Sequence, residues 1–274
     1  MIYPRKLLWT LFLFAVPLAL GACSGLVPLT PLPTSTPSTT PTATVTIQWF
    51  PATDTPTSLP ASTPVPTENT LPGIGDRLFA DAFDQPDLWN TATSSVASAA
   101  VTGNRLLLSI SGRLLKPIIS LRSEPLLADF YAEATVNVDL CGSLDKYGLV
   151  FRASSVEDYY RFALNCNGQM RLERILSGLA TPLGGWLSSG DVPTGAPATV
   201  KIGVWAVGNE MRFFLNDRYQ LTVIDRFLPA GSLGFFAYAS GSTPVTVAFT
   251  DLAVYSVFYV SPAPSAIPSS TAHP

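Results

Sequence analysis

The sequence has few of the residues that most enzymes use for catalysis. Its single histidine, His273, lies in a Pro/Ser-rich tail, so a Ser-His-Asp triad is excluded in practice. Charged residues make up only 13% of the 274 positions, against about 25% in ordinary globular proteins. The net charge of -3 gives no electrostatic case for binding nucleic acid. Glycine-rich phosphate loops are also absent.

The first 23 residues are typical of a secretion signal. Arg5 and Lys6 provide a positive start, and residues 7–20 form an apolar stretch of 14 residues. A membrane-spanning helix needs about 20 residues, so this stretch is short for a span. It ends in Leu-Gly-Ala-Cys, which resembles the lipobox of bacterial lipoproteins. The resemblance implies a lipid on Cys23 and an anchor in the bilayer, on its extracytoplasmic face. The alternatives are an ordinary signal peptide with a chance cysteine, or an uncleaved anchor.

Residues 24–75 form a predicted disordered linker. They contain 11 prolines and 14 threonines, with Asp54 and Glu68 as the charged side chains. Such a segment cannot bury enough apolar surface to offset its ordering entropy. Proline-rich chain rises about 3.1 Å per residue, which predicts a stalk on the order of 100 Å. The short apolar run at 45–50 is the exception. Residues 261–274 form a second predicted disordered segment.

Residues 76–260 predict a single domain built from short strands. The segment has no convincing long amphipathic helix, and runs of alternating apolar and polar residues are separated by turn residues. About ten or more strands in roughly 185 residues indicate an all-β sandwich of two antiparallel sheets. Besides a central meander, the expected strands span residues 78–83, 105–109, 117–121, 128–140, 198–207, 211–215, 218–224, 231–240 and 245–257.

The central meander, residues 147–175, predicts three antiparallel strands with a defined register. Its second hairpin turns at residues 166–168, which read Cys-Asn-Gly. A three-residue loop with Gly168 in the left-handed conformation sets Arg161 opposite Glu173. A two-residue loop would instead set two arginines opposite each other, which is unfavourable. We therefore predict the three-residue loop.

The same reasoning, extended across the loop at 155–158, pairs Phe151 with Phe162 and sets Arg152 beside Arg161. One face of the meander is then apolar and the other is polar. The apolar face comprises Leu149, Phe151, Phe162, Leu164, Met170 and Leu172. The polar face comprises Arg152, Tyr159, Arg161, Asn165, Gln169, Arg171 and Glu173.

This polar face is the candidate ligand-binding surface. Its charged groups can bind sugar hydroxyls or a carboxylate, and Tyr159 can stack on a sugar ring. Trp186 lies in a glycine-rich loop, where an exposed indole would suit the same purpose. The competing interpretation is a solvated sheet face, on which Arg161 and Glu173 form a surface pair worth under about 1 kcal/mol.

Several stretches of the domain carry a family resemblance: FADAFDQPDLW, YGLVFRAS with YYRF and NGQMRLER, VGNEMRFFLNDRYQLTVID, and GSLGFFAYAS with VAFTDLAVY. They resemble the concanavalin A-like jelly roll, and more narrowly the laminin-G-like and 3-keto-disaccharide hydrolase-like domains of bacterial lipoproteins. The resemblance covers nearly all of residues 76–260. It implies a fold rather than an activity, because the motifs are strand, turn and core positions. It also implies that residues 78–83 lie beside residues 247–255.

The chain lacks the carboxylates of the sandwich glucanases that share this fold. Those enzymes place acid and nucleophile on one strand in a Glu-x-Asp-x-x-Glu run. No such run occurs, and Glu157 and Asp158 are adjacent, so they would point to opposite faces of a strand. The sequence therefore identifies no catalytic residue, and it favours a protein that is not an enzyme.

With Cys23 assigned to the lipid, Cys141 and Cys166 remain. An even remainder in an exported protein favours a disulfide, with two free thiols as the alternative. Aspartates at Asp81 and Asp84, together with Asp251 in the adjacent last strand, suit a structural calcium ion. Turn formation at a strand end explains the same aspartates, so both interpretations stay open.

The sequence thus predicts a membrane-anchored, extracytoplasmic lipoprotein that displays one jelly-roll domain. Non-catalytic binding of extracellular glycan is the leading expectation for its function. One alternative is a hydrolase that acts on a sugar derivative through an unidentified site. The other is a structural or adhesive envelope protein that binds other proteins. Apart from the calcium ion, the residues imply no cofactor.

Overall fold

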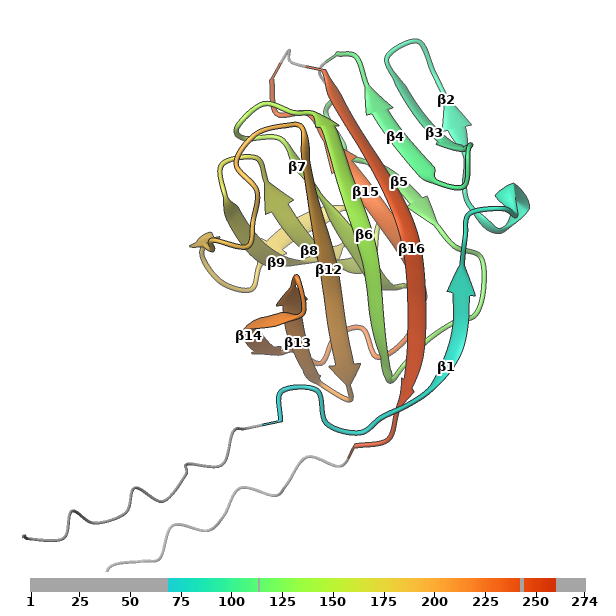
Figure 1. Ribbon diagram of the computed structural model, residues 1–274, viewed down its shortest axis with the longest axis vertical. Helices are drawn as coiled ribbons and strands as arrows, with labels where there is room; N and C mark the ends of the chain where they lie inside the picture. Colours follow the sequence, from blue (N-terminus) through green and yellow to red (C-terminus); the bar gives the residue numbers. More distant parts are fainter. Residues whose placement is uncertain (1–68, 113, 242–243, 260–274) are drawn as a thin grey trace, which may run out of the picture. The chain divides into compact units, whose positions relative to one another are not determined.

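The structure is a computed structural model, and it describes residues 69–112, 114–241 and 244–259. Cys23, the predicted secretion signal, most of the predicted linker and nearly all of the predicted tail lie outside these residues. Within them the chain is almost entirely β-strand, with one 3-10 turn, η1 (Pro86–Leu88). None of the described helical segments has the length and apolar character needed to cross a membrane. The strands form two antiparallel sheets (Figure 1).

The larger sheet has nine strands in the order β14-β13-β12-β6-β16-β4-β3-β2, and β1 also pairs with β16. The first and last long strands lie side by side, with Phe79 opposite Val254, as the family resemblance implied. The strands of this sheet are β1 (Ile74–Asp81), β2 (Ala92–Thr93), β3 (Ala97–Val101), β4 (Leu106–Ile110), β6 (Phe130–Leu140), β12 (Ala198–Val207), β13 (Glu210–Leu215), β14 (Arg218–Ile224) and β16 (Val245–Val257).

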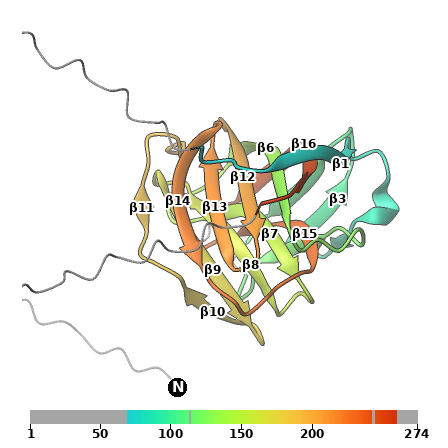
Figure 2. The same cartoon turned by 90° about the horizontal axis from the view of Figure 1, so that it is seen from below.

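The smaller sheet has seven strands in the order β10-β9-β8-β7-β15-β5, and β11 also pairs with β9. Figure 2 shows this sheet lying against the larger one as a second layer. The predicted two-sheet sandwich is therefore confirmed. The strands of this sheet are β5 (Ile118–Leu121), β7 (Lys146–Ala153), β8 (Tyr159–Asn165), β9 (Gln169–Leu176), β10 (Leu179–Pro182), β11 (Leu187–Ser188) and β15 (Ser232–Tyr238).

The hydrophobic core lies between the two sheets. All six residues of the predicted apolar face of the meander are in it, because a period of two sends alternate side chains to one face of each strand. Phe162 of β8 contacts Phe213 of β13 in the opposite sheet, with ring centroids 4.7 Å apart. Cys141 follows β6 and Cys166 follows β8, and the two form a disulfide with Cα atoms 6.4 Å apart. The predicted disulfide is confirmed, and it joins the two sheets covalently.

The predicted register is correct for one of the two hairpins of the meander and wrong for the other. In the β8–β9 hairpin Arg161 lies opposite Glu173, so the three-residue loop is confirmed. In the β7–β8 hairpin the prediction is wrong by two residues, because Phe162 lies opposite Leu149. The cause lies at Arg152, where a φ of 48° and a register shift against β15 mark a bulge. Regular pairing of β7 with β8 ends at Phe151.

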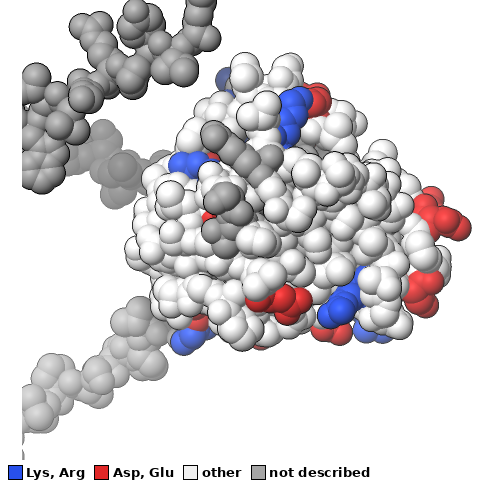
Figure 3. Space-filling view, turned by 90° about the horizontal axis from the view of Figure 1, so that it is seen from above, with Lys and Arg blue, Asp and Glu red and all other residues white. Residues whose placement is uncertain are grey.

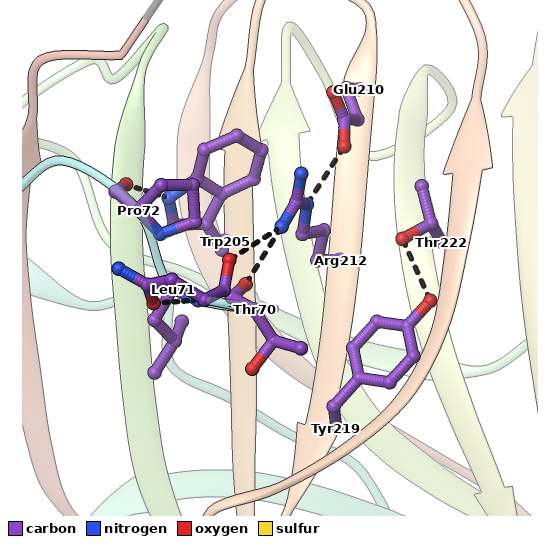
Figure 4. Close-up of polar contacts among 9 residues, drawn as sticks. Thr70, Leu71, Pro72, Trp205, Glu210, Arg212, Tyr219 and Thr222 are labelled. Carbon is purple, nitrogen blue, oxygen red and sulfur yellow. Dashed lines mark hydrogen bonds and ion pairs between the residues drawn. The ribbon is translucent and has the colours of Figure 1, made fainter. Parts of the chain in front are cut away.

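Residues 69–72, which we call the strap, lie on the outer face of the nine-stranded sheet (Figure 4). Trp205 Nε1 donates a hydrogen bond of 3.0 Å to the carbonyl of Pro72. Arg212 Nη1 donates to the carbonyls of Asn69 at 3.3 Å and Thr70 at 3.2 Å. The predicted linker boundary at residue 75 is therefore too late. The backbone N–H of Phe258 donates to the carbonyl of Gly73 at 2.8 Å, so both ends of the described domain lie together.

Candidate functional site

The candidate site is a groove on the outer face of the seven-stranded sheet. It consists of two adjoining hollows of about 290 Å³ and about 260 Å³, which share Lys116, Pro117, Tyr159 and Gly178. We call both hollows together the outer groove. The first is also lined by Ile118, Ile119, Val156 and Glu157, and the second by Leu115, Lys146, Arg161, Ile175, Ala180 and Tyr238.

Two irregular segments form the walls of the outer groove. One is the chain just before β5, which includes Lys116. The other is the turn between β9 and β10, where Gly178 has a φ of 77° that favours glycine. A Cβ atom at Gly178 would collide with the carboxylate of Glu157. Lys116 Nζ lies 2.8 Å from Glu157 Oε1 in the β7–β8 loop. The backbone N–H of Gly178 donates to the carbonyl of Glu157 at 2.9 Å, so Glu157 connects the two walls.

Charged side chains are sparse on the face of the domain seen in Figure 3, where they lie singly or in small groups. At the second hollow of the outer groove, by contrast, three cations surround one carboxylate. Arg161 and Arg171 both form ion pairs with Glu173, and Lys146 lies near enough to influence the same carboxylate. We call these four residues the cation cluster. It has two positive charges in excess.

Glu173 is the buried centre of the cation cluster, with only 1% of its surface exposed. Burial by itself would raise the pKa of Glu173, but Arg161 and Arg171 outweigh that effect and hold the pKa below its ordinary value. Arg161 is also buried, and its guanidinium lies 5.0 Å from the ring centroid of Phe236. The interpretation of this pair as a solvated surface pair is therefore wrong. Both carboxylate oxygens of Glu173 are occupied by guanidinium groups.

Lys146 differs from the two arginines because it has no ion-pair or hydrogen-bond partner among the described residues. It begins β7, where it lies opposite Tyr238 of β15. Its Nζ is 5.5 Å from the ring centroid of Trp186 and 5.8 Å from that of Tyr238. Burial lowers the pKa of Lys146; Glu173 opposes this effect, while Arg161 and Arg171 add to it.

The two aromatic residues predicted for the site are less exposed than expected. Trp186 is only partly exposed, and the Arg171 guanidinium lies 4.4 Å from its ring centroid. Strand β11 holds this loop against β9, with Leu187 opposite Met170. Tyr159 is 2% exposed, so its ring belongs to the floor of the groove and cannot stack on a ligand.

Arg152 is not in the site, and its predicted place in the polar row is wrong. Its guanidinium is 1% exposed and donates to the carbonyls of Ala128, Gly208 and Leu228. The bulge at Arg152 turns its side chain away from the groove. Burial lowers the pKa of Arg152, while Asp129 opposes that effect. Arg152 thus holds three loops together and has a structural role.

The aspartates considered for calcium do not come together as a ligand set. Asp81 is buried, and its carboxylate accepts hydrogen bonds from the backbone of Phe83, from Trp89 Nε1 and from Arg122 Nε. Asp84 and Asp251 are exposed, and Asp251 accepts from the Thr250 hydroxyl. Among the described residues, no three acidic, histidine or cysteine side chains are grouped so that they could hold a metal ion. Asp81 therefore serves the turn after β1, as the alternative interpretation expected, and it also pairs with Arg122.

Sequence reasoning missed Lys116, Lys146 and Tyr238 as groove residues. A signal for Lys146 existed, because strand periodicity places it on the same face as Val150, away from the core. No comparable signal existed for Tyr238, since its position beside Lys146 depends on the pairing of β7 with β15. Lys116 lies in the irregular chain before β5, where the sequence has no alternation of apolar and polar residues that could predict which way a side chain points.

The fold and the groove define the protein as a jelly-roll sandwich with an open site on one sheet. No protein-family model matches the sequence. No curated protein matches it by sequence either. Among solved structures, the carbohydrate-binding module CBM66 from Bacillus subtilis is similar, with a TM-score of 0.50 and 16% identity over 62% of this chain and 96% of that module.

A second similar structure is SCLam, a non-specific endo-β-1,3(4)-glucanase from family GH16. Its TM-score is 0.50, with 11% identity over 69% of this chain and 97% of that chain. At such identities the likeness shows the fold alone. The fold implied by the sequence resemblance is therefore confirmed, and the function has to be argued from the site.

Proposed function

We propose that the protein is a lipoprotein, anchored at the extracytoplasmic face of a membrane through Cys23, whose jelly-roll domain binds carbohydrate in the outer groove without catalysis. The outer groove is the observation that carries the proposal. Tyr238 and Lys146 line its second hollow, and the partly exposed Trp186 lies beside Lys146 and Arg171 next to it. Aromatic rings beside cationic donors are a combination that suits a sugar. The likeness to a carbohydrate-binding module supports this proposal as an analogy.

Binding without catalysis is favoured over hydrolysis by the state of Glu173. A glycosidase needs a protonated carboxylic acid beside the scissile bond, and therefore a carboxyl group whose pKa is raised. Glu173 is instead paired with two guanidinium groups, and its pKa is lowered. Its carboxylate is held ionised and serves to position the arginines.

The proposed anchor rests on the sequence of the first 23 residues and gains support from the disulfide. Disulfides persist in oxidising compartments outside the cytoplasm, and Cys141 and Cys166 are bonded to each other. The test is metabolic labelling of the full chain with an alkyne-tagged fatty acid. We expect label on the wild-type chain and none on Cys23→Ser, which should also leave the membrane fraction. Label that persists in Cys23→Ser would refute the anchor.

The proposed binding is tested with the full chain, purified in detergent, on an array of plant, fungal and bacterial polysaccharides. We expect selective binding that Trp186→Ala weakens at least tenfold, because the indole lies 5.5 Å from the ammonium of Lys146, which lines the second hollow. Tyr219→Ala is the matched control, since Tyr219 is an exposed aromatic residue on β14 of the other sheet. An array without any bound glycan, or equal losses in the two variants, would refute carbohydrate binding in the outer groove.

A further inference from the structure

The cation cluster has more positive charge than the folding of the sheet requires. Glu173 can pair with both arginines, and it does so with both of its oxygens. Lys146 forms no ion pair or hydrogen bond with that carboxylate, nor with any other group among the described residues. A charge that is partly removed from water without a partner is unfavourable, so Lys146 carries a cost that a purely structural residue would not need to have.

The surroundings of Lys146 do not supply the missing partner. The rings of Trp186 and Tyr238 attract its ammonium, but a cation–π contact at a partly exposed site is weaker than a charge-assisted hydrogen bond to an anion. Arg161 and Arg171 repel it, and the pKa of Lys146 is lowered, first by burial and further by these two arginines. The ammonium of Lys146 lines the second hollow of the outer groove, where a ligand can reach it.

We infer that the outer groove binds glycans through an acidic substituent, a carboxylate or a sulfate ester, that pairs with the ammonium of Lys146. The inference rests on the proposed carbohydrate binding and specifies its ligand class. An oxyanion accepts charge-assisted hydrogen bonds from the three N–H groups of the lysine. It also offsets the excess positive charge of the cation cluster.

A neutral sugar fits this position less well. Its hydroxyl groups can accept hydrogen bonds from Lys146, but they leave two positive charges in excess beside the ligand. The rings of Trp186 and Tyr238 flank the ammonium, so a sugar ring can lie against an aromatic face while its acidic substituent reaches Nζ. Nζ of Lys146 lies 5.5 Å from the ring centroid of Trp186 and 5.8 Å from that of Tyr238. One sugar residue can therefore contact an aromatic ring and the ammonium at the same time.

The test uses matched pairs of oligosaccharides and the full chain in detergent. Galacturonate oligomers are compared with their carboxyl-reduced forms, and sulfated galactan oligomers with their desulfated forms. Affinity is measured by calorimetry for the wild type, Lys146→Met and Lys146→Arg. Lys201→Met is the control, because Lys201 is a lysine on the outer face of the other sheet, paired with Glu133. Circular dichroism verifies that each variant folds.

We expect at least tenfold tighter binding of the acidic member of one pair, lost in Lys146→Met and retained in Lys146→Arg and Lys201→Met. The pair that shows the effect identifies carboxylate or sulfate as the source of the charge. Equal binding of acidic and neutral members would overturn the inference and leave carbohydrate binding intact. Acidic binding that survives Lys146→Met would overturn the role of the lysine. No binding of any member, here and on the array, would refute the proposed function as well.

Discussion

The outer face of the nine-stranded sheet is partly covered by the strap, whereas the outer face of the seven-stranded sheet carries the open outer groove. On the first, the strap covers Trp205 and gives Arg212 two carbonyl partners. On the second, Lys146 has no such partner among the described residues. Both faces present aromatic and cationic side chains. The two faces differ in whether the protein itself supplies hydrogen-bond acceptors for the cationic side chains.

This difference teaches how to separate structural from ligand-binding polar residues in a sandwich. Arg212 on one face and Arg161 on the other are buried to the same extent, 8% exposed, and each is paired with a glutamate. Burial therefore does not distinguish the two faces. The partner of each cation does: Arg212 is paired within the protein, whereas the partly exposed ammonium of Lys146 has no partner among the described residues and lines the groove.

The largest expected effect comes from breaking the centre of the cation cluster. Glu173→Gln would leave Arg161 and Arg171 partly buried without a counter-charge. We expect the free energy of unfolding to fall by about 3–5 kcal/mol, since removing one partner of a buried pair has a cost of that order. Urea denaturation measures it. Glu157→Gln is the control, because its exposed pair with Lys116 should be worth less than about 1 kcal/mol. Similar losses in both variants would mean that the cluster is not buried.

The next effect tests the covalent link between the two sheets. In the double variant Cys141→Ser, Cys166→Ser the unfolded chain regains the entropy of a loop that the disulfide closes over a separation of 25 residues. The chain-entropy relation gives a loss of about 3 kcal/mol. Guanidinium denaturation of the variant, beside the wild type with and without reductant, measures the loss. A change below about 1 kcal/mol would show that the sheets do not depend on the link.

A smaller effect is expected from opening the strapped face. Arg212→Met removes two hydrogen bonds to the strap and the ion pair with Glu210. We expect a loss of about 1–3 kcal/mol and faster amide hydrogen exchange in residues 69–73. Glycan binding in the outer groove should not change. Arg77→Met, at an exposed position of β1, serves as the control. Unchanged exchange in the strap would contradict its proposed attachment.

The smallest effect concerns pH. Because the pKa of Glu173 is lower in the folded state than its ordinary value of 4.5, the unfolded chain binds this proton more readily. The stability that Glu173 contributes is therefore complete above about pH 4.5 and declines as the pH falls through the folded pKa. We expect the difference in unfolding free energy between wild type and Glu173→Gln to shrink from pH 6 to pH 3. A constant difference would contradict the ionised pair.

The sequence predicts the register of the β8–β9 hairpin correctly. The Arg161–Glu173 pair follows from the charges on two adjacent strands and from a glycine, Gly168, whose φ is 79°. The two charged residues and the glycine all belong to the same hairpin, so local sequence is enough to predict the pair. The adjacency of β1 and β16 came from the family resemblance.

Features that depend on distant segments were not predictable. The bulge at Arg152 is stabilised by carbonyl groups of Ala128, Gly208 and Leu228, which lie far from it in the sequence. No local pattern indicates that an arginine in a strand will turn to three such acceptors. The strap was likewise hidden, since residues 69–72 share the composition of the linker before them.

The strap also determines how a mechanical load enters the domain. A pull on the chain before residue 69 acts first on the hydrogen bonds from Trp205 and Arg212, and then on the pairing of β1 with β16. A load on the outer groove acts on the opposite sheet. A force applied between the strap and the outer groove is therefore transmitted from one sheet to the other, and the Cys141–Cys166 disulfide connects the two sheets covalently. The strap can peel away while the two layers stay joined, so a pull on the chain before residue 69 releases the strap before it disturbs the outer groove.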